Sequence, residues 1–329
     1  DTAADMLYAD HYQLTTGEGD QTFRRKHPLI DCQKGALRND FDFGSVLVFR
    51  TSSFRRAVRA METDYQWAAL YDLRLRMKNI VHINEYLYTE IETDRRKSGE
   101  KQFDYVDPRN RARQVELERA CTRHLRSINA YLHAGEFDTI KFENSEKFQV
   151  EATVVIPVRD RVRTIADAIE SVLMQKTTFA FNLMVVDNGS TDGTSDVIAK
   201  YTSDPRVIHI IPSRTDLGIG GCWNMAVHDD RVGRFVVQLD SDDLYSGEDT
   251  LQRIVDMFFQ ENAAMVIGSY RMCNFQLETL PPGLIDHREW TPQNGRNNAL
   301  RINGLGAPRA FYTPVLREIQ IPNTSYGED

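Results

Sequence analysis

Hydrophobic and polar positions in the second half of the chain alternate between strand-like and helix-like patterns. Residues 152–157 form a continuous β-branched run, which is typical of a strand buried on both faces. Residues 164–175 follow with apolar positions at helical spacing. The same alternation predicts strands at 181–186, 207–211 and 234–239, and helices at 193–201 and 223–229. Strands and helices in this order predict a mostly parallel, doubly wound α/β sheet with helices on both faces.

The first half of the chain has a different pattern. Residues 109–133 contain no Pro or Gly and predict one long helix. Its six arginines are interleaved with Glu116 and Glu118, which favours a solvated helix face over a nucleic-acid surface. The polar, irregular stretch that follows predicts a linker. We therefore expect an α+β N-terminal segment at 1–135, a linker at 136–150 and a second domain at 151–329.

Composition narrows the range of functions. The 329 residues are 41% hydrophobic and 27% charged, as in a soluble protein of about two domains. No apolar run approaches the roughly 20 residues that span a bilayer, although peripheral membrane association stays open. The net charge of −8 falls in residues 151–329, which argues against nucleic acid and suits a metal-bridged phosphate ligand. The four cysteines lack C-x-x-C spacing and predict reduced thiols in a cytoplasmic protein.

Three carboxylates follow the predicted strand at 234–239 at once: Asp240, Asp242 and Asp243. Burying an unpaired carboxylate costs on the order of several kcal/mol, so such a cluster needs a cation or a wet cleft. Mg²⁺ and Mn²⁺ take oxygen ligands, and Mg²⁺ is often shared between one or two carboxylates and a substrate phosphate. On these residues alone, a metal–diphosphate site and a solvated turn before a helix are equally good interpretations.

Two other loops lie at expected strand ends, where doubly wound sheets bind ligands. Asp187 ends the strand at 181–186 and can either accept a hydrogen bond from a nucleobase or ribose, or brace its own turn. Residues 217–224 are rich in glycine and enter a helix, which can form a cradle for an anion. A glycine cluster alone is weak evidence for such a cradle.

Taken in order, five motifs of the second half resemble those of the family 2 glycosyltransferases with the GT-A fold, the Rossmann-like fold of nucleotide-diphospho-sugar transferases. The motifs are Val154-Val-Ile-Pro-Val158 with Arg159-Asp160, Ala168-Ile-Glu-Ser-Val-Leu-Met-Gln175, Val186-Asp-Asn-Gly-Ser-Thr-Asp-Gly-Thr194, Gly218 to Asn224, and Leu239-Asp-Ser-Asp-Asp243. The resemblance implies a metal-dependent enzyme that moves a sugar from a nucleotide-sugar donor to a hydroxyl acceptor, with inversion. The acceptor would be a polysaccharide, a glycolipid or a similar molecule.

The resemblance also implies roles for single residues. Asp242, in the D-x-D motif, would bind the Mn²⁺ or Mg²⁺ that bridges the diphosphate, and Asp240 would lie near the ribose. Asp329, in Ser325-Tyr-Gly-Glu-Asp329, matches the general base that deprotonates the acceptor. His287 and Trp290 are candidate acceptor-side contacts. The other implied donor-binding residues are Pro157, Val158, Arg159, Asp160, Asp187, Asn188, Gly218, Asn224 and Ser241.

The N-terminal half bears a partial resemblance to the same family. Residues 6–12 are similar to an acidic strand end, 43–56 to an acceptor-side segment and 80–88 to a closing strand. This implies that residues 1–135 are the back half of a second such unit, although Asp10 lacks a D-x-D partner; a helical accessory domain is the alternative. The donor-binding front of that unit would then be absent. Because the sequence stops at Asp329, we also expect the domain at 151–329 to be truncated at its C-terminal end.

Two other functions remain open. A nucleotidyltransferase would also use an acidic strand end and a metal, but no glycine-rich loop with a lysine follows the first predicted strand. A catalytically inactive nucleotide-sugar-binding module is the second alternative, which the retained Asp242 and Asp329 disfavour.

Overall fold

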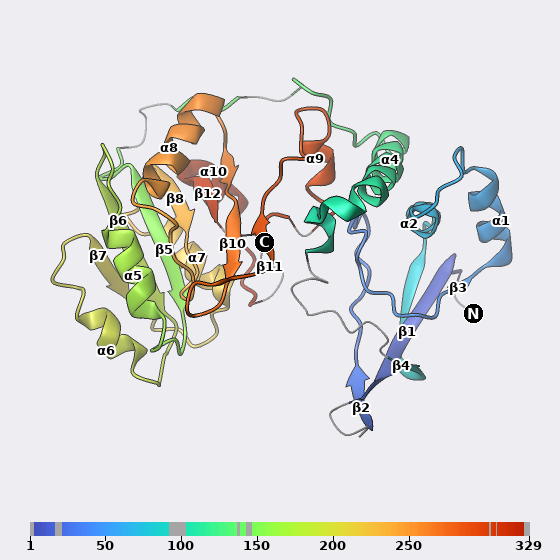
Figure 1. Cartoon of the computed structure of the whole chain (residues 1–329), viewed down its shortest axis with the longest axis horizontal. Helices are drawn as coiled ribbons and strands as arrows, with labels where there is room; N and C mark the ends of the chain where they lie inside the picture. The colour runs from blue at the N-terminus through green and yellow to red at the C-terminus, as the bar shows by residue number, and fades with distance from the viewer. Residues whose placement is uncertain are drawn as a thin grey trace. The chain divides into compact units, whose positions relative to one another are not determined.

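The computed structural model describes residues 3–16, 22–91, 103–136, 139–142, 147–302, 304–306 and 308–325 (Figure 1). The chain forms two compact units, and each is described by itself. Unit 1 comprises Asp1–Glu136 and Arg271–Gly304, and unit 2 comprises Phe137–Tyr270 and Leu305–Asp329.

Unit 2 is built on a six-stranded sheet with the strand order β7-β6-β5-β8-β12-β9. Its four parallel strands are β5 (Ala152–Val158), β6 (Phe181–Asp187), β7 (Val207–Ile210) and β8 (Phe235–Gln238). The strand β12 (Arg309–Tyr312) runs antiparallel between β8 and β9 (Met265–Ile267). The predicted mostly parallel sheet is therefore confirmed, and an antiparallel strand extends it on one side.

Both faces of this sheet are covered, because successive side chains of a strand point to opposite faces. Val154 and Ile156 of β5 pack in one buried cluster, and Val155 packs in another. The first cluster includes residues of α5 (Ile165–Leu173), α6 (Thr194–Ala199) and α8 (Thr250–Glu261). The second includes residues of α7 (Ile219–Val227) and α10 (Thr313–Ile319). This explains why β5 and β6 are continuous apolar runs.

Unit 1 contains a sheet centred on β1 (Met6–Thr16). The strand β4 (Ile80–Ile91) pairs with β1 in parallel, and β2 (Thr22–His27) and β3 (Val48–Phe49) pair with it antiparallel. The other elements of unit 1 include a separate two-stranded sheet. They are α1 (Thr51–Arg59), α2 (Ala69–Leu75), η2 (Asp104–Val106), η3 (Pro108–Asn110), α4 (Arg111–Ser127), β10 (Tyr270–Cys273, whose first residue belongs to unit 2), β11 (Thr279–Ile285) and α9 (Gly295–Asn298). The sheet centred on β1 differs from the helical accessory domain that the sequence left open.

The predicted helix at 109–133 is observed as α4, which is shorter. Asn129 has a φ of 57°, in the left-handed region where an α-helix does not continue. Leu117, Cys121 and Leu125 are buried along one face of α4. The arginines lie elsewhere on the helix, and Arg111 forms an ion pair with Glu118 at 2.7 Å. Arg123 is half-buried and pairs with the buried Asp72, whereas the other arginines of α4 are exposed and form a solvated basic face.

The unit boundaries differ from the boundaries that the sequence suggested. Residues 271–304 group with unit 1, where Arg301 donates hydrogen bonds to Asn39 and Gln114. The expected linker at 136–150 differs as well, because Ile140 and Phe142 pack against the core of unit 2. Contacts between residues so far apart in sequence leave no local pattern that a sequence reading can detect.

Among the described residues, no helix combines the length and the apolar character that a bilayer crossing requires.

Candidate functional site

The acidic cluster begins where β8 ends. The side chain of Gln238, the last residue of β8, donates a hydrogen bond to Oδ1 of Asp240 at 2.8 Å. Gln238 in turn accepts a hydrogen bond from Nε of Arg309 on β12 at 2.7 Å. The backbone N–H of Asp243 donates to the carbonyl of Asp240 at 3.1 Å, which closes a turn. Asp240 is thus oriented by side chains of two neighbouring strands.

Negative charge accumulates in this turn. Desolvation, followed by the charges of Asp240 and Asp242, raises the pKa of Asp243 to about 6. Asp243 keeps an exposed surface, and the two neighbouring carboxylates also disfavour its charged form. A group whose charged form is disfavoured by its neighbours gains from a nearby cation. The turn therefore has the electrostatics of a cation site.

The side chain of Asp242 is accessible to solvent. Its side chain is 53% exposed and lies 3.9 Å from Nε of Arg161, an exposed ion pair that compensates little charge. Arg161 follows β5, and its backbone N–H donates to Oγ1 of Thr194 at 2.8 Å. No role for Arg161 was predicted from the sequence. The only available signal was its place in the arginine-rich loop after the first strand of the sheet.

The acidic turn offers oxygen ligands of the kind that Mn²⁺ and Mg²⁺ bind. Among the described residues, no three Asp, Glu, His or Cys side chains are placed to hold one metal ion. Mg²⁺ is commonly held by one or two carboxylates together with waters and substrate phosphates, so a closed protein cage is not required. Asp240 and Asp242, with the raised pKa of Asp243 beside them, fit a partial site that a diphosphate completes.

We expect Mn²⁺ affinity to rise as the pH increases through about 6. Below that pKa, Asp243 is protonated and its charge is lost from the cluster; above it, the carboxylate attracts the cation. Calorimetric titration with Mn²⁺ on both sides of this pH measures the effect. Asp243→Asn should flatten the pH dependence, whereas Asp230→Asn, at an exposed site elsewhere in unit 2, should preserve it. An affinity that does not change with pH in the unaltered chain would contradict the assignment.

The loop after β5 is tied to the loop after β6. Asp160 has a φ of 53°, and its carboxylate accepts a hydrogen bond from the N–H of Thr191 at 2.7 Å. Its own N–H donates to Oγ of Ser190 at 3.0 Å. Pro157 and Val158 end β5, and Val158 packs in the core. Asp160 therefore clamps two loops together, and Arg159 remains exposed on the same loop.

Asp187 braces its own turn. It is 1% exposed, and its carboxylate accepts hydrogen bonds from the N–H of Ser190 and the hydroxyl of Ser195, with His209 3.5 Å away. Burial acts to raise the pKa of Asp187, but these hydrogen bonds outweigh it and the pKa is lowered. Asn188 extends the network through its amide to the carbonyl of Leu217 at 2.8 Å. A nucleobase contact of Asp187 stays a prediction.

The glycine-rich loop differs from the anion cradle that the sequence suggested. The N–H of Gly218 donates to Oδ1 of Asn323, and the N–H of Gly220 donates to the carbonyl of Thr324. Asn224 exchanges two hydrogen bonds with the backbone of Ile321. A Cβ on Gly220 would collide with the carbonyl of Pro322. The glycines thus permit a close approach of residues 321–324, which occupy the N–H groups that an anion would need.

The acceptor-side candidates lie in unit 1. His287 and Trp290 stack with ring centroids 4.3 Å apart, and burial lowers the pKa of His287. Within the described part of the chain, neither Nδ1 of His287 nor Nε1 of Trp290 has a hydrogen-bond partner, although both atoms are buried. Ser241 is buried in unit 2. Asp329 lies outside the described residues.

The sheet of unit 2 and its acidic turn are similar to a known protein family. A family model described as "Glycosyl transferase family 2" matches residues 153–314. Residues 153–314 belong to glycosyl transferase family 2. The match begins in β5, includes Asp240 to Asp243 and ends just after β12, so the GT-A fold expected from the five motifs is confirmed.

Individual relatives match shorter stretches. An uncharacterized glycosyltransferase of Rickettsia felis is 29% identical over 124 residues, which are 38% of this chain and 20% of that protein. The O-antigen chain rhamnosyltransferase WbaN of Salmonella anatum is 33% identical over 86 residues, 26% of each protein. The crystal structure of S. aureus TarS 1–349 is 22% identical, covers 54% of this chain and 52% of that one, and has a TM-score of 0.44. The chain spans less than half the length of these curated relatives.

Proposed function

We propose that this chain takes part in metal-dependent transfer of a sugar from a nucleotide-sugar donor to a hydroxyl acceptor, using Mn²⁺ or Mg²⁺. The observation that carries the proposal is the acidic turn after β8, where Asp240, Asp242 and Asp243 lie within four residues and the side chain of Asp242 is 53% exposed. Membership of family 2 supports the reaction class. A polysaccharide, glycolipid or similar acceptor is part of the proposal.

In this reaction the chain's residues have separate tasks. Asp242 would hold the cation, which as a Lewis acid would neutralise charge on the departing nucleoside diphosphate, and Asp240 would lie near the ribose. Gln238 and Arg309 fix the orientation of Asp240, and Arg161 adds a positive charge beside Asp242. Inversion would follow from direct attack of the acceptor hydroxyl on the anomeric carbon.

The acceptor side of the reaction needs a general base and a surface that binds the acceptor. A general base must take the proton of the attacking hydroxyl, and Asp329 is the proposed base by its position in the family pattern. The stacked pair of His287 and Trp290 is the proposed acceptor contact, because buried polar atoms without partners are the groups that a ligand can satisfy.

A nucleotidyltransferase or an inactive nucleotide-sugar-binding module would share the acidic turn. The family assignment favours sugar transfer over nucleotidyl transfer. A binding measurement alone would not distinguish an active transferase from an inactive binding module. Transfer of the sugar is the measurement that distinguishes them. We also propose a cytoplasmic location, supported by four cysteines that are all free thiols.

A thermal-shift screen with nucleoside diphosphates tests the donor site. We expect one base to raise the melting temperature only when Mn²⁺ is present, because metal and diphosphate complete one another's coordination. A ligand at about 100 times its dissociation constant stabilises by about 2.7 kcal/mol, which is a measurable shift. Chelation of the metal is the control and should return the melting temperature to its starting value. Equal shifts with and without Mn²⁺ would contradict metal-dependent donor binding.

We further propose that unit 1 is the back half of a second unit of the same kind, and strand register supports it. Met6 of β1 faces Phe49 of β3, and Val236 of β8 faces Phe311 of β12. In both units the antiparallel strand runs directly into a helix that begins with threonine, Thr51 or Thr313. The other edge of each central strand pairs with a parallel neighbour, β4 or β5.

This register places Asp10 at the position of Asp240 and Tyr12 at the position of Asp242. Oδ1 of Asp10 accepts hydrogen bonds from the N–H of Leu29 at 2.7 Å and from His82 at 2.8 Å. Burial acts to raise the pKa of Asp10, but these bonds and the nearby histidines lower it. Oδ1 of Asp10 is thus compensated, and a tyrosine takes the place of the second carboxylate of the D-x-D motif. We propose on this basis that the strand end of unit 1 holds no catalytic metal.

A further inference from the structure

The backbone of Arg161 in unit 2 is held by hydrogen bonds on both sides. Its N–H donates to Oγ1 of Thr194 at 2.8 Å, and its carbonyl accepts from the N–H of Ile165 at 3.0 Å. The N–H of the next residue, Val162, donates to Oδ2 of Asp192 at 3.0 Å. The point from which the arginine side chain extends is therefore fixed by α5, by α6 and by the loop before α6.

The guanidinium of Arg161 is held less firmly. Its Nη1 donates to the carbonyl of Asp160 at 3.2 Å, whereas Nε lies 3.9 Å from Oδ2 of Asp242, beyond hydrogen-bond distance. The side chains of Arg161 and Asp242 are 51% and 53% exposed, and exposed ion pairs of this kind stabilise little. The pair can therefore separate easily.

One edge of this guanidinium is open to a ligand. Nε and Nη2 form the edge that Arg206 uses to bind both oxygens of Asp204, at 3.1 and 2.8 Å. In Arg161, neither Nε nor Nη2 donates a hydrogen bond to any residue that the structure describes. Such an edge matches two oxygens of a carboxylate or a phosphate.

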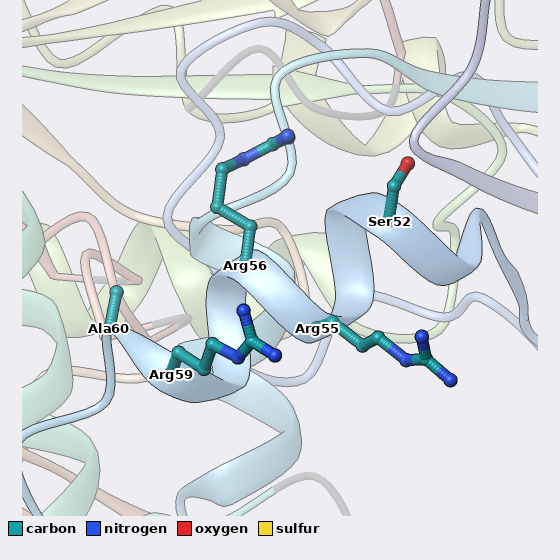
Figure 2. A pocket seen from close by; sticks show the side chains of 5 residues that line it. All are labelled: Ser52, Arg55, Arg56, Arg59 and Ala60. Carbon is teal, nitrogen blue, oxygen red and sulfur yellow. The ribbon is translucent and has the colours of Figure 1, made fainter.

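Helix stability does not account for Arg161. Cations are favoured at the C-terminal end of a helix and disfavoured at its N-terminal end. The basic cluster on α1 follows this rule, because Arg56 and Arg59 lie in the last turn, beside the open hollow that they line with Arg55 (Figure 2). Arg161 is placed in the opposite way, one turn before α5. An anion bound to the guanidinium would remove this disadvantage.

We propose that the guanidinium of Arg161 exchanges partners between Asp242 and the diphosphate of the donor. It pairs with Asp242 in the absence of metal. When a divalent cation is bound to Asp242, the two positive charges repel and the Nε and Nη2 edge turns to the diphosphate. The inference rests on the proposed function, since it takes Asp242 as the metal ligand.

The exchange predicts two effects of opposite sign when the charge is removed. In water, unit charges about 4 Å apart interact by an amount equivalent to about fivefold in affinity. Arg161→Gln should therefore strengthen the binding of Mn²⁺ alone by about fivefold, because Asp242 loses a competing cation. It should weaken the binding of a nucleoside diphosphate at saturating Mn²⁺ by about fivefold. A residue that only supports the fold would not strengthen metal binding.

Calorimetric titration tests both effects, first with Mn²⁺ alone and then with UDP, GDP, ADP and dTDP at saturating Mn²⁺. Arg161→Lys keeps the charge but loses the planar edge. It should bind Mn²⁺ as the unaltered chain does and recover only part of the diphosphate affinity. Arg161 is exposed, so thermal melting should show that both variants fold.

The matched control is Arg231→Gln. Arg231 is also 51% exposed and pairs with an aspartate, Asp229, but it precedes β8, whereas the acidic turn follows that strand. Its removal changes the net charge of unit 2 by the same amount and should alter neither affinity.

Several results would overturn the role of Arg161 while metal-dependent donor binding stands. They are an affinity of Arg161→Gln for Mn²⁺ alone that is unchanged or weaker, a diphosphate affinity that is unchanged, and equal effects of Arg161→Gln and Arg231→Gln. A lysine variant that behaves as the glutamine variant does would also overturn it. If none of the four nucleotides binds the unaltered chain with Mn²⁺, the proposed donor site itself fails, and the role of Arg161 fails with it.

Discussion

Asp242→Asn is expected to lower Mn²⁺-dependent donor binding by at least about a hundredfold, with a matching loss of sugar transfer. Of the three carboxylates after β8, Asp242 has a 53% exposed side chain and only a 3.9 Å contact to Arg161, so its oxygens are available to a cation. Asparagine keeps one oxygen but removes the charge. At an effective dielectric constant of about 20, unit charges about 4 Å apart attract by about 4 kcal/mol, which exceeds the loss we expect.

The measurement is Mn²⁺ and donor binding by calorimetry, followed by transfer assays with the donor that binds. Asp230→Asn is the matched control, because it removes one exposed carboxylate of unit 2 away from the acidic turn. If unit 1 is the back half of a second unit, as we propose, Tyr12 takes the position of Asp242 there, and Asp242→Asn should remove the tight Mn²⁺ site of the whole chain. Tight Mn²⁺ binding that persists in this variant would place the metal elsewhere.

The sequence predicted the sheet of unit 2 well, because its strands are buried on both faces. A strand of this kind needs an apolar residue at nearly every position, and β5 and β6 show that run without interruption. The acidic turn was also visible, since three carboxylates follow β8 within five residues. Local patterns of this type depend on neighbours in sequence, which a sequence displays directly.

Features that depend on distant residues could not be predicted. The glycines from Gly218 to Gly221 suggested an anion cradle, but they make room for residues 321–324, about a hundred positions later. Asp160 was expected to contact the donor, and its carboxylate instead joins two loops through Thr191. Arg161 differs from its neighbour Arg159 only in what the fold brings near it, which is Asp242. Hydrogen-bond partners of this kind are chosen by tertiary structure.

Arg301→Ala is expected to lower the free energy of unfolding of unit 1 by about 3 to 5 kcal/mol. Arg301 is 2% exposed, and burial lowers the pKa of its guanidinium. Its Nη1 donates to Oδ1 of Asn39 at 2.7 Å and to Oε1 of Gln114 at 2.9 Å. Removal leaves two acceptors unpaired, at about 1 to 3 kcal/mol each, and opens a cavity.

Urea unfolding measures this loss, and Arg288→Ala is the control. Arg288 lies in the same segment, but its side chain is 84% exposed and pairs with Asp286 at the surface, so its removal should cost less than about 1 kcal/mol. Both variants remove an arginine and its charge, but Arg301 is buried and Arg288 is exposed. A large loss for Arg301→Ala alone means that residues 271–304 are held in unit 1 through this guanidinium. Equal, small losses would mean that the contacts of Arg301 do not hold residues 271–304 in unit 1. Unit 1 would then comprise only the residues up to about Glu136.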